Sequence, residues 1–358
     1  MLGSLTKGAD LTSMIVSASL LKPYSSLQKL GTDMMSRSNY LPEIVACKDP
    51  LERSLMVAKF FISGFHPDTF DGKKPFNPIL GEQCHHVFNH GEEFGKSYYF
   101  SEQVSHHPPI FAAHVVNDKI GVKATLTGKT KVIFGGNFID VKFPGHKEIY
   151  FKEHDELYTI ETPFLCVRGV MGIGKKGIER SGQLIVRCEK TGYVTKVHFK
   201  PLGFLGLWGT WNAVDGHTKL VTKEKGKKKK ELLKTFDGYW TSTINVTDAK
   251  SGEKEVFYDY EGMSKYNIKP VEIPLEKRSK LDSGNVWRKA IEGILSGDMK
   301  SANEGKHEVE VHQRELRARL KKEGKKHEHA FFDSIKDDHW VPKEEAVAQY
   351  ILSELSVH

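Results

Sequence analysis

The sequence predicts an α+β protein that is mainly β, built as an antiparallel barrel or sandwich with helices before and after it. Between residue 97 and about residue 260, many short strand-like runs are separated by Gly, Asn, Asp or Pro. No helical pattern intervenes between these runs, which favours antiparallel pairing over βαβ units. Apolar residues at helical spacing precede and follow this region, and no internal repeat is found.

The composition is that of a folded protein with an ordinary core. Of the 358 residues, 39% are hydrophobic and 28% are charged, which excludes a disordered chain and suggests one large domain or two ordinary ones. The net charge of +7 is concentrated, because residues 219–234 hold eight Lys and two Glu. We therefore predict one basic loop, at residues 223–234, and no nucleic-acid-binding surface.

The cysteines and apolar runs indicate a cytoplasmic protein. The four cysteines form no C-x-x-C pair, so we predict no disulfide scaffold, no metal site and no cofactor. The apolar run at residues 14–21 is short and contains Ser17 and Ser19, so it is not interpreted as a signal peptide. No run reaches the ~20 apolar residues of a membrane-spanning helix.

The helix and strand candidates follow in chain order. Residues 1–40 are too weakly patterned to predict an element, whereas Asp49 followed by Pro50 is typical of a helix start, and apolar residues continue at helical spacing to Ile62. The strongest strand candidates are residues 98–100, 110–113, 122–126, 131–134, 148–151, 157–160, 183–186 and 194–199.

The chain becomes helical again after Pro274. Residues 283–295 and 302–323 are the helix candidates, and Gly324 is placed to end the second one. A basic cluster at residues 317–322 is interpreted as exposed helix surface. The last thirty residues show no clear pattern, although two buried phenylalanines are predicted at residues 331–332.

A glycine-rich segment at residues 169–177 matches two nucleotide-binding patterns by letter. A strand follows the segment where a dinucleotide site needs a helix, and Lys176 stands where a phosphate-binding loop needs Ser or Thr. We interpret the segment as a connection between strands.

Three further segments are candidates for anion binding. In residues 72–82, two prolines limit the backbone and hold Lys74, Asn77 and the free N–H groups of Leu80 and Gly81 in a fixed relation. An ordinary structural turn is an equally good interpretation of this segment.

The second segment, residues 102–109, contains His106 and His107 followed by two prolines. Neighbouring side chains on an extended chain point to opposite sides, which is poor geometry for one metal ion. Imidazoles can instead donate to phosphate oxygens and gain charge as they do so. From composition alone, a pair of half-exposed structural histidines is favoured.

The third segment lies on the second C-terminal helix, where Lys306, Glu310 and Arg314 recur every four residues and therefore share one face. The alternative is a solvated ladder of ion pairs worth ~0.3–0.5 kcal/mol each. From the residues alone, this alternative is favoured.

The run Glu-Gln-Val-Ser-His-His-Pro-Pro at residues 102–109 resembles the signature of the oxysterol-binding-protein related lipid-transfer family. Residues 74–82 resemble the second fingerprint of that family, and the spacing of Lys306, Glu310 and Arg314 resembles its headgroup-binding helix. Residues 49–64 are similar to the family's helix before the barrel. The resemblance implies a large, near-complete antiparallel β-barrel around a hydrophobic tunnel.

On this resemblance the chain is one lipid-binding domain, residues 1–358. It would comprise a lid and N-terminal segment at 1–40, a helical segment at 41–72, the barrel at 73–262 and a C-terminal helical region at 263–358. The chain looks like a short member that consists of this domain alone. The lid, at residues 2 to about 30, would close over the tunnel with Met14, Ile15 and Val16 facing the ligand.

The resemblance also implies the function. Family members exchange a buried sterol, or phosphatidylserine in some members, for phosphatidylinositol 4-phosphate. The headgroup-binding residues implied by the resemblance are Lys74, Asn77, Leu80, Gly81, His106, His107, Lys306, Glu310 and Arg314. We expect a monomer that visits anionic membranes transiently, with the basic segment adding weak attraction.

Two other classes of function are alternatives to lipid transfer. A lipid sensor or scaffold would bind phosphoinositide or sterol and recruit partners without moving lipid. An enzyme is not expected, because no Ser–His–Asp order, carboxylate pair or metal-ligand set is recognised.

Overall fold

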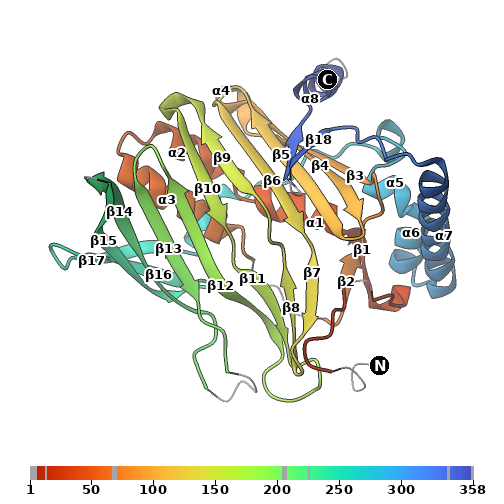
Figure 1. Ribbon diagram of the computed structural model, residues 1–358, viewed down its shortest axis with the longest axis horizontal. Helices are drawn as coiled ribbons and strands as arrows, with labels where there is room; N and C mark the ends of the chain where they lie inside the picture. The colour runs from red at the N-terminus through yellow and green to blue at the C-terminus, as the bar shows by residue number, and fades with distance from the viewer. Residues whose placement is uncertain are drawn as a thin grey trace.

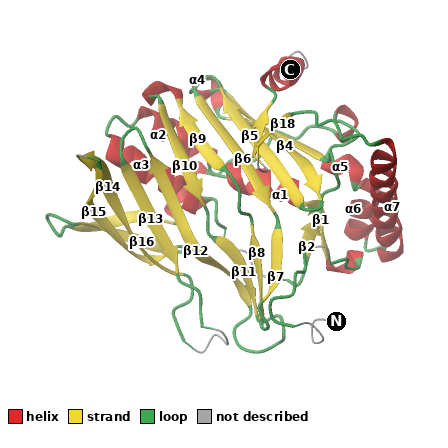
Figure 2. Ribbon diagram, in the orientation of Figure 1, coloured by secondary structure: helices red, strands yellow, loops and turns green. Residues whose placement is uncertain are grey.

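A computed structural model describes residues 6–12, 14–66, 71–203, 208–224, 226–336 and 339–355 of the chain. Figure 1 shows a long curved sheet with the N-terminal helices behind it and the C-terminal helices beside one end. Strands dominate, as Figure 2 shows, and helices cluster at the chain ends. The predicted class, α+β and mainly β, is confirmed.

The main sheet is antiparallel and has 15 strands among the described residues. Its path runs through β17 (Lys254–Asp259), β16 (Thr243–Asp248), β15 (Lys227–Tyr239), β14 (Ala213–Glu224), β13 (Tyr193–Phe199), β12 (Gly177–Cys188), β10 (Glu156–Glu161), β9 (Lys147–Phe151), β6 (Val122–Lys129), β5 (Pro109–Asn117), β4 (Lys96–His106) and β3 (Gln83–Asn89). Off this path, β11 (Phe164–Arg168) pairs with β12, and β8 (Phe138–Lys142) joins β11 to β7 (Lys131–Phe134). The sheet is barrel-like but not closed, because β17 and β3 do not pair.

Burial along the strands explains why the sequence pattern predicted them. In β10, Glu156, Tyr158 and Ile160 are buried while Leu157 and Glu161 are exposed, which is the alternation of a strand with one solvated face. Strand β5 is buried along its whole length, because C-terminal residues such as Phe331 and Phe332 pack over β3 to β5 from the other side. The prediction of two buried phenylalanines is confirmed.

The N-terminal helices fill the inside of the curved sheet. They are α1 (Ser26–Met35), α2 (Leu41–Ala46) and α3 (Pro50–Ser63), preceded by β1 (Leu21–Ser25), with short 3₁₀ turns η2 (Ala18–Leu20) and η3 (Ser38–Tyr40). Asp49 caps α3 as predicted, with its carboxylate accepting the N–H of Glu52 at 2.8 Å. Helix α1 was not predicted, although Ser25 and Gln28 form a capping box at its start.

The C-terminal region begins with η5 (Gly262–Tyr266) and η6 (Leu275–Lys277) and continues with α5 (Ser283–Val286), α6 (Arg288–Ser296) and α7 (Met299–Glu323). The helix predicted at 283–295 is broken at Trp287, which leaves helical geometry and donates its indole N–H to Glu82 at 2.9 Å. Helix α7 ends at Gly324 in the left-handed conformation, as predicted. Small residues let α6 and α7 pack closely, since a Cβ on Gly293 would lie 2.5 Å from the Ala302 nitrogen.

The last thirty residues contain a hairpin of β18 (Phe332–Lys336) and β19 (His339–Pro342), followed by α8 (Glu344–Leu355). No clear pattern was found in this part of the sequence, because most residues of the hairpin and of α8 are exposed or half-buried. The remaining elements are β2 (Lys74–Phe76), α4 (Gly91–Phe94) and η4 (Lys152–His154). Within the described residues, no helix has both the length and the apolar character needed to cross a bilayer.

The basic segment at 223–234 is not the loop that we predicted. Strands β14 and β15 form a long hairpin in which Lys223 lies opposite Lys228 and the turn contains Gly226 at φ +78°. These strand ends were not predicted, because consecutive exposed lysines show no alternation of apolar and polar residues. Pairing extends into them from the buried half of the hairpin, around Val214 and Phe236. The glycine-rich segment at 169–177 does connect two strands, β11 and β12, as predicted.

Candidate functional site

Three segments that are distant in sequence, one of them α7, meet at one end of the sheet. The turn after β2 contacts the β4–β5 turn, where the His106 Nδ1 lies 3.0 Å from the Pro78 carbonyl oxygen. The same turn contacts α7, since the Leu80 N–H donates to Gln313 Oε1 at 3.0 Å. The structure therefore joins the three candidate anion-binding segments into one region, at the right of Figure 1.

The two histidines lie at the β4–β5 turn. Strand β4 ends at His106 and β5 begins at Pro109, so His107 belongs to the turn. The imidazole rings are 4.8 Å apart and nearly perpendicular. The prediction that they point to opposite sides is wrong, because the chain is not extended at His107.

The protonation of His106 limits how it can hold an anion. A carbonyl oxygen only accepts, so the Nδ1 that lies against Pro78 carries the hydrogen, and the Nε2 of the neutral ring is an acceptor. Burial, with help from the neighbouring His107, lowers the pKa of His106 to about 4. An anion at Nε2 therefore requires this imidazole to take up a proton.

Lysines on β2 and α7 contribute positive charge to the site. Lys74 Nζ donates to the Met14 carbonyl at 3.2 Å, and Lys306 Nζ lies 2.6 Å from Glu310 Oε1. The side chains of Lys306 and Glu310 are only 11% and 27% exposed. Burial and then the Lys306 cation lower the pKa of Lys74, while Glu310 opposes the shift, so the three groups share one environment.

Arginines extend this environment along α7. Arg314 lies one turn beyond Glu310 with an exposed side chain. Burial and then the Arg317 guanidinium lower the pKa of His107. The sequence interpretation assigned Arg317 to ordinary helix surface and missed its place near the histidines.

The backbone N–H groups of the turn are not free, contrary to the sequence prediction. The Leu80 N–H is held by Gln313, and the Gly81 N–H donates to the Gln103 carbonyl at 2.9 Å. Asn77 is exposed beside them. Gln313 is buried, and in the described part of the chain its Nε2 has no hydrogen-bond partner, so this side chain brings an unsatisfied donor to the site.

Two buried glutamates position the segments, and neither was recognised from the sequence. Glu82 accepts hydrogen bonds from the Ile79 N–H, the Ser283 hydroxyl and the Trp287 indole, and burial raises its pKa. Glu102 accepts from the N–H groups of Ala330 and Phe331 at 3.2 and 3.0 Å. Each carboxylate thus ties its motif to the C-terminal region.

The N-terminal segment lies against one edge of the sheet. Residues 6–12 lie along β7, with the Leu11 N–H donating to the Val132 carbonyl at 2.8 Å. Ile15 is 65% exposed, and its contact with a ligand stays a prediction. Met14 is half-buried and Val16 packs beside β1 and α6. Residues 2–5 and 13 of the predicted lid lie outside the described residues.

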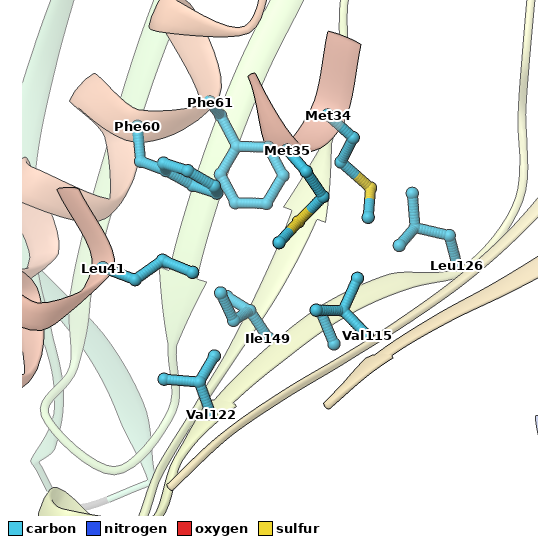
Figure 3. Close-up of a pocket in the computed structure, with 10 residues that line it drawn as sticks. Met34, Met35, Leu41, Phe60, Phe61, Val115, Val122, Leu126 and Ile149 are labelled. Carbon is cyan, nitrogen blue, oxygen red and sulfur yellow. The ribbon is translucent and has the colours of Figure 1, made fainter. Parts of the chain in front are cut away.

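A small apolar pocket lies between the N-terminal helices and the sheet. Figure 3 shows Met34 and Met35 of α1 and Phe60 and Phe61 of α3 above the strands that carry Val115, Val122, Leu126 and Ile149. The open space is about 20 Å³, roughly the room for one water molecule. The lining is apolar throughout.

Comparison with known proteins identifies the family. The family model described as oxysterol-binding protein matches residues 2–350. Oxysterol-binding protein-related protein 8 of Homo sapiens is 31% identical over 311 residues, covering 86% of this chain and 34% of the relative. Oxysterol-binding protein-like protein OBPa of Candida albicans is 29% identical over 339 residues, covering 94% of this chain and 75% of the relative. The chain spans about a third of the length of the human relative.

Solved structures share the fold. The ORD domain of Osh1 in complex with cholesterol superposes with a TM-score of 0.77 at 22% identity, covering 96% of this chain and 86% of that one. The Osh3 ORD in complex with PI(4)P from Saccharomyces cerevisiae superposes with a TM-score of 0.71 at 22% identity, covering 93% and 86%. On its sequence, and consistently with this fold, the chain belongs to the oxysterol-binding protein family.

Proposed function

We propose that the protein is a lipid-transfer protein that exchanges a sterol, or phosphatidylserine, for phosphatidylinositol 4-phosphate between membranes. It acts as a monomer and leaves the lipid chemically unchanged. The observation that carries the proposal is the convergence of His106, Lys74 and Lys306 from three distant segments at one end of an apolar-lined sheet. The complexes of Osh1 with cholesterol and Osh3 with PI(4)P support both lipid classes.

In this proposal the phosphate groups lie among Lys74, His106, His107, Lys306 and Arg314, and Glu310 accepts from inositol hydroxyls. Lys306 is already paired with Glu310, so a bound phosphate would share this lysine with the Glu310 carboxylate. Gln313 Nε2 is a further donor, and rotation of the Gln313 side chain would release the Leu80 N–H to the ligand. Asn77 and Gly81 border the site.

The apolar part of either lipid would enter between the N-terminal helices and the sheet. Because the pocket there is small, entry requires side chains such as Met34 and Met35 to repack, which their flexibility makes easy. A sterol that hides ~400 Å² of apolar surface gains ~10 kcal/mol, enough for a protein interior to compete with a bilayer. Two lipids that occupy the same interior cannot be bound at once. Binding of one lipid therefore requires release of the other, which is an exchange.

The headgroup supplies the competing free energy. Three or four hydrogen bonds to a phosphate contribute ~1.5–3 kcal/mol each, less the cost of protonating His106. Anionic membrane surfaces would attract the protein first, with exposed lysines contributing ~1 kcal/mol per residue close to the surface.

Vesicle-to-vesicle transfer tests the proposal. Donor vesicles carry phosphatidylinositol 4-phosphate and acceptor vesicles carry a fluorescent sterol, and both lipids are followed in the same reaction. We expect each lipid to speed the transfer of the other. Stoichiometric binding without transfer would replace the proposal by a lipid sensor or scaffold, and a chemically altered lipid at the end of the reaction would indicate an enzyme.

A further inference from the structure

Glu102, His327 and His329 come together beside the headgroup-binding candidates. Glu102 belongs to β4, whereas the two histidines belong to the segment between α7 and β18. One ligand atom from each of the three side chains lies within 4.8 Å of the other two. The imidazole rings of His327 and His329 are 4.9 Å apart.

Glu102 needs a positive partner. Its carboxylate is completely buried, and in the described part of the chain the ion-pair partner within 4.0 Å is His329, whose Nδ1 lies 3.0 Å from Oε1. Neither a lysine nor an arginine pairs with it there. The N–H groups of Ala330 and Phe331 donate hydrogen bonds to it but carry no full positive charge, and a buried carboxylate is stabilised further by a cation. The two imidazoles can supply that cation by binding a metal ion.

We propose that Glu102, His327 and His329 form a binding site for a divalent transition metal, with Zn²⁺ the best fit. Two imidazoles and one carboxylate are a common zinc donor set, and water completes a tetrahedron at such sites. Both histidines are partly exposed, which leaves a path for the ion and for that water.

The geometry needs only small adjustments. With metal–ligand bonds of about 2.0–2.2 Å, ligand atoms around tetrahedral zinc are about 3.3–3.5 Å apart. Side-chain rotation would bring the three ligand atoms to this separation. A hydrogen-bonded pair of Glu102 and His329 would explain part of the cluster but not His327. The His327 ring packs against the turn at Gly81, where a Cβ added to the glycine would lie 2.4 Å from His327 Nε2.

The site would hold the C-terminal segment against the two segments that carry Gly81 and Glu102. Both of these segments contribute to the candidate headgroup site. Metal binding would therefore stabilise the arrangement of that site whichever lipid it takes, and the inference does not depend on lipid transfer.

Zinc titration of the tag-free 358-residue chain tests the proposal. We expect one equivalent of Zn²⁺ to bind, a higher unfolding temperature with zinc, and an X-ray absorption spectrum with only nitrogen and oxygen ligands. His327→Asn leaves the backbone hydrogen bonds to Glu102 in place and should weaken zinc binding at least about tenfold. His329→Asn should do the same.

The control is His307→Asn with His312→Asn, since both of these histidines are exposed on α7. Zinc affinity unchanged in His327→Asn, or weakened equally in the control, would overturn the assignment. A sulfur atom among the ligands would overturn it too, because it would point to Cys84, whose Sγ lies 3.4 Å from His86 Nε2. If His327→Asn does not fold, His329→Asn provides the second test, and the spectrum of the unmodified protein still excludes a sulfur-containing site.

Discussion

Two groups of lysines lie at opposite ends of the molecule in Figure 1, and they differ in their exposure and in their neighbours. The β14–β15 hairpin presents Lys227 to Lys230 on one short run, all exposed, with Lys223 and Lys228 directly opposite each other. At the other end, Lys74 and Lys306 come from separate segments, and Lys306 is nearly buried beside Glu310.

This difference shows that the amount of charge and its use are separate properties. Exposed lysines keep their hydration and are screened by salt, so an anion gains little by approaching any one of them. Partly buried cations and neutral imidazoles have lost water, so a phosphate group of the right geometry gains more from them. We therefore expect headgroup binding to respond strongly to changes at His106, His107 and Lys306 and weakly to changes in the hairpin.

The largest effect is expected from His106→Ala combined with His107→Ala. Extraction of phosphatidylinositol 4-phosphate from liposomes should fall at least about 100-fold, because two charge-assisted hydrogen bonds are lost. Sterol extraction should stay within about twofold, since the apolar interior is untouched. His307→Ala with His312→Ala serves as the matched control. Equal loss of both lipids would mean that the variant has damaged the fold instead.

A smaller effect is expected from Lys306→Gln. Removing this one cation should weaken phosphatidylinositol 4-phosphate extraction about tenfold, and the glutamine can still donate to Glu310. Lys300→Gln, at an exposed position near the start of α7, should leave extraction unchanged. If the two variants behaved alike, Lys306 would be an ordinary surface lysine.

Binding should also depend on pH. The pKa of His106 is about 4 in the free protein, and a bound phosphate must raise it, so binding takes up a proton. Affinity should then increase as pH falls, by about threefold to tenfold between pH 8 and pH 6.5. The double histidine variant should show only the pH dependence of the lipid. An affinity that rises with pH would contradict the role of His106.

The smallest effect is expected from replacing Lys227, Lys228, Lys229 and Lys230 by glutamine. Headgroup extraction at physiological salt should change less than about twofold, because exposed charges are screened over about 8 Å. Binding to anionic vesicles at low salt should weaken if the hairpin meets the membrane. Extraction reduced as strongly as in the double histidine variant would reverse the comparison between the two regions.

Much of the sheet was predictable because strand burial alternates locally, as in β10 around Tyr158. The elements that the sequence did not predict depend on tertiary packing. Helix α1 packs against Tyr99 at Gly31, where a Cβ would lie 2.6 Å from the ring, and this partner is far away in sequence. The lysine ends of β14 and β15 pair because the rest of the hairpin is already formed.

The candidate site was predicted only through the family resemblance. Spacing placed Lys306, Glu310 and Arg314 on one face of a helix, but no local pattern shows what that face meets. Gln313 and Leu80, which join α7 to the turn, are 233 residues apart. The buried roles of Glu82 and Glu102 depend on partners just as distant, so charge and periodicity could not reveal them.

The position of the headgroup can be tested by photo-crosslinking with a phosphatidylinositol 4-phosphate analogue that carries its reactive group on the headgroup. We expect crosslinked peptides from three segments, residues 71–82, residues 102–110 and helix α7. Crosslinks concentrated in the β14–β15 hairpin, with none in these three segments, would contradict it.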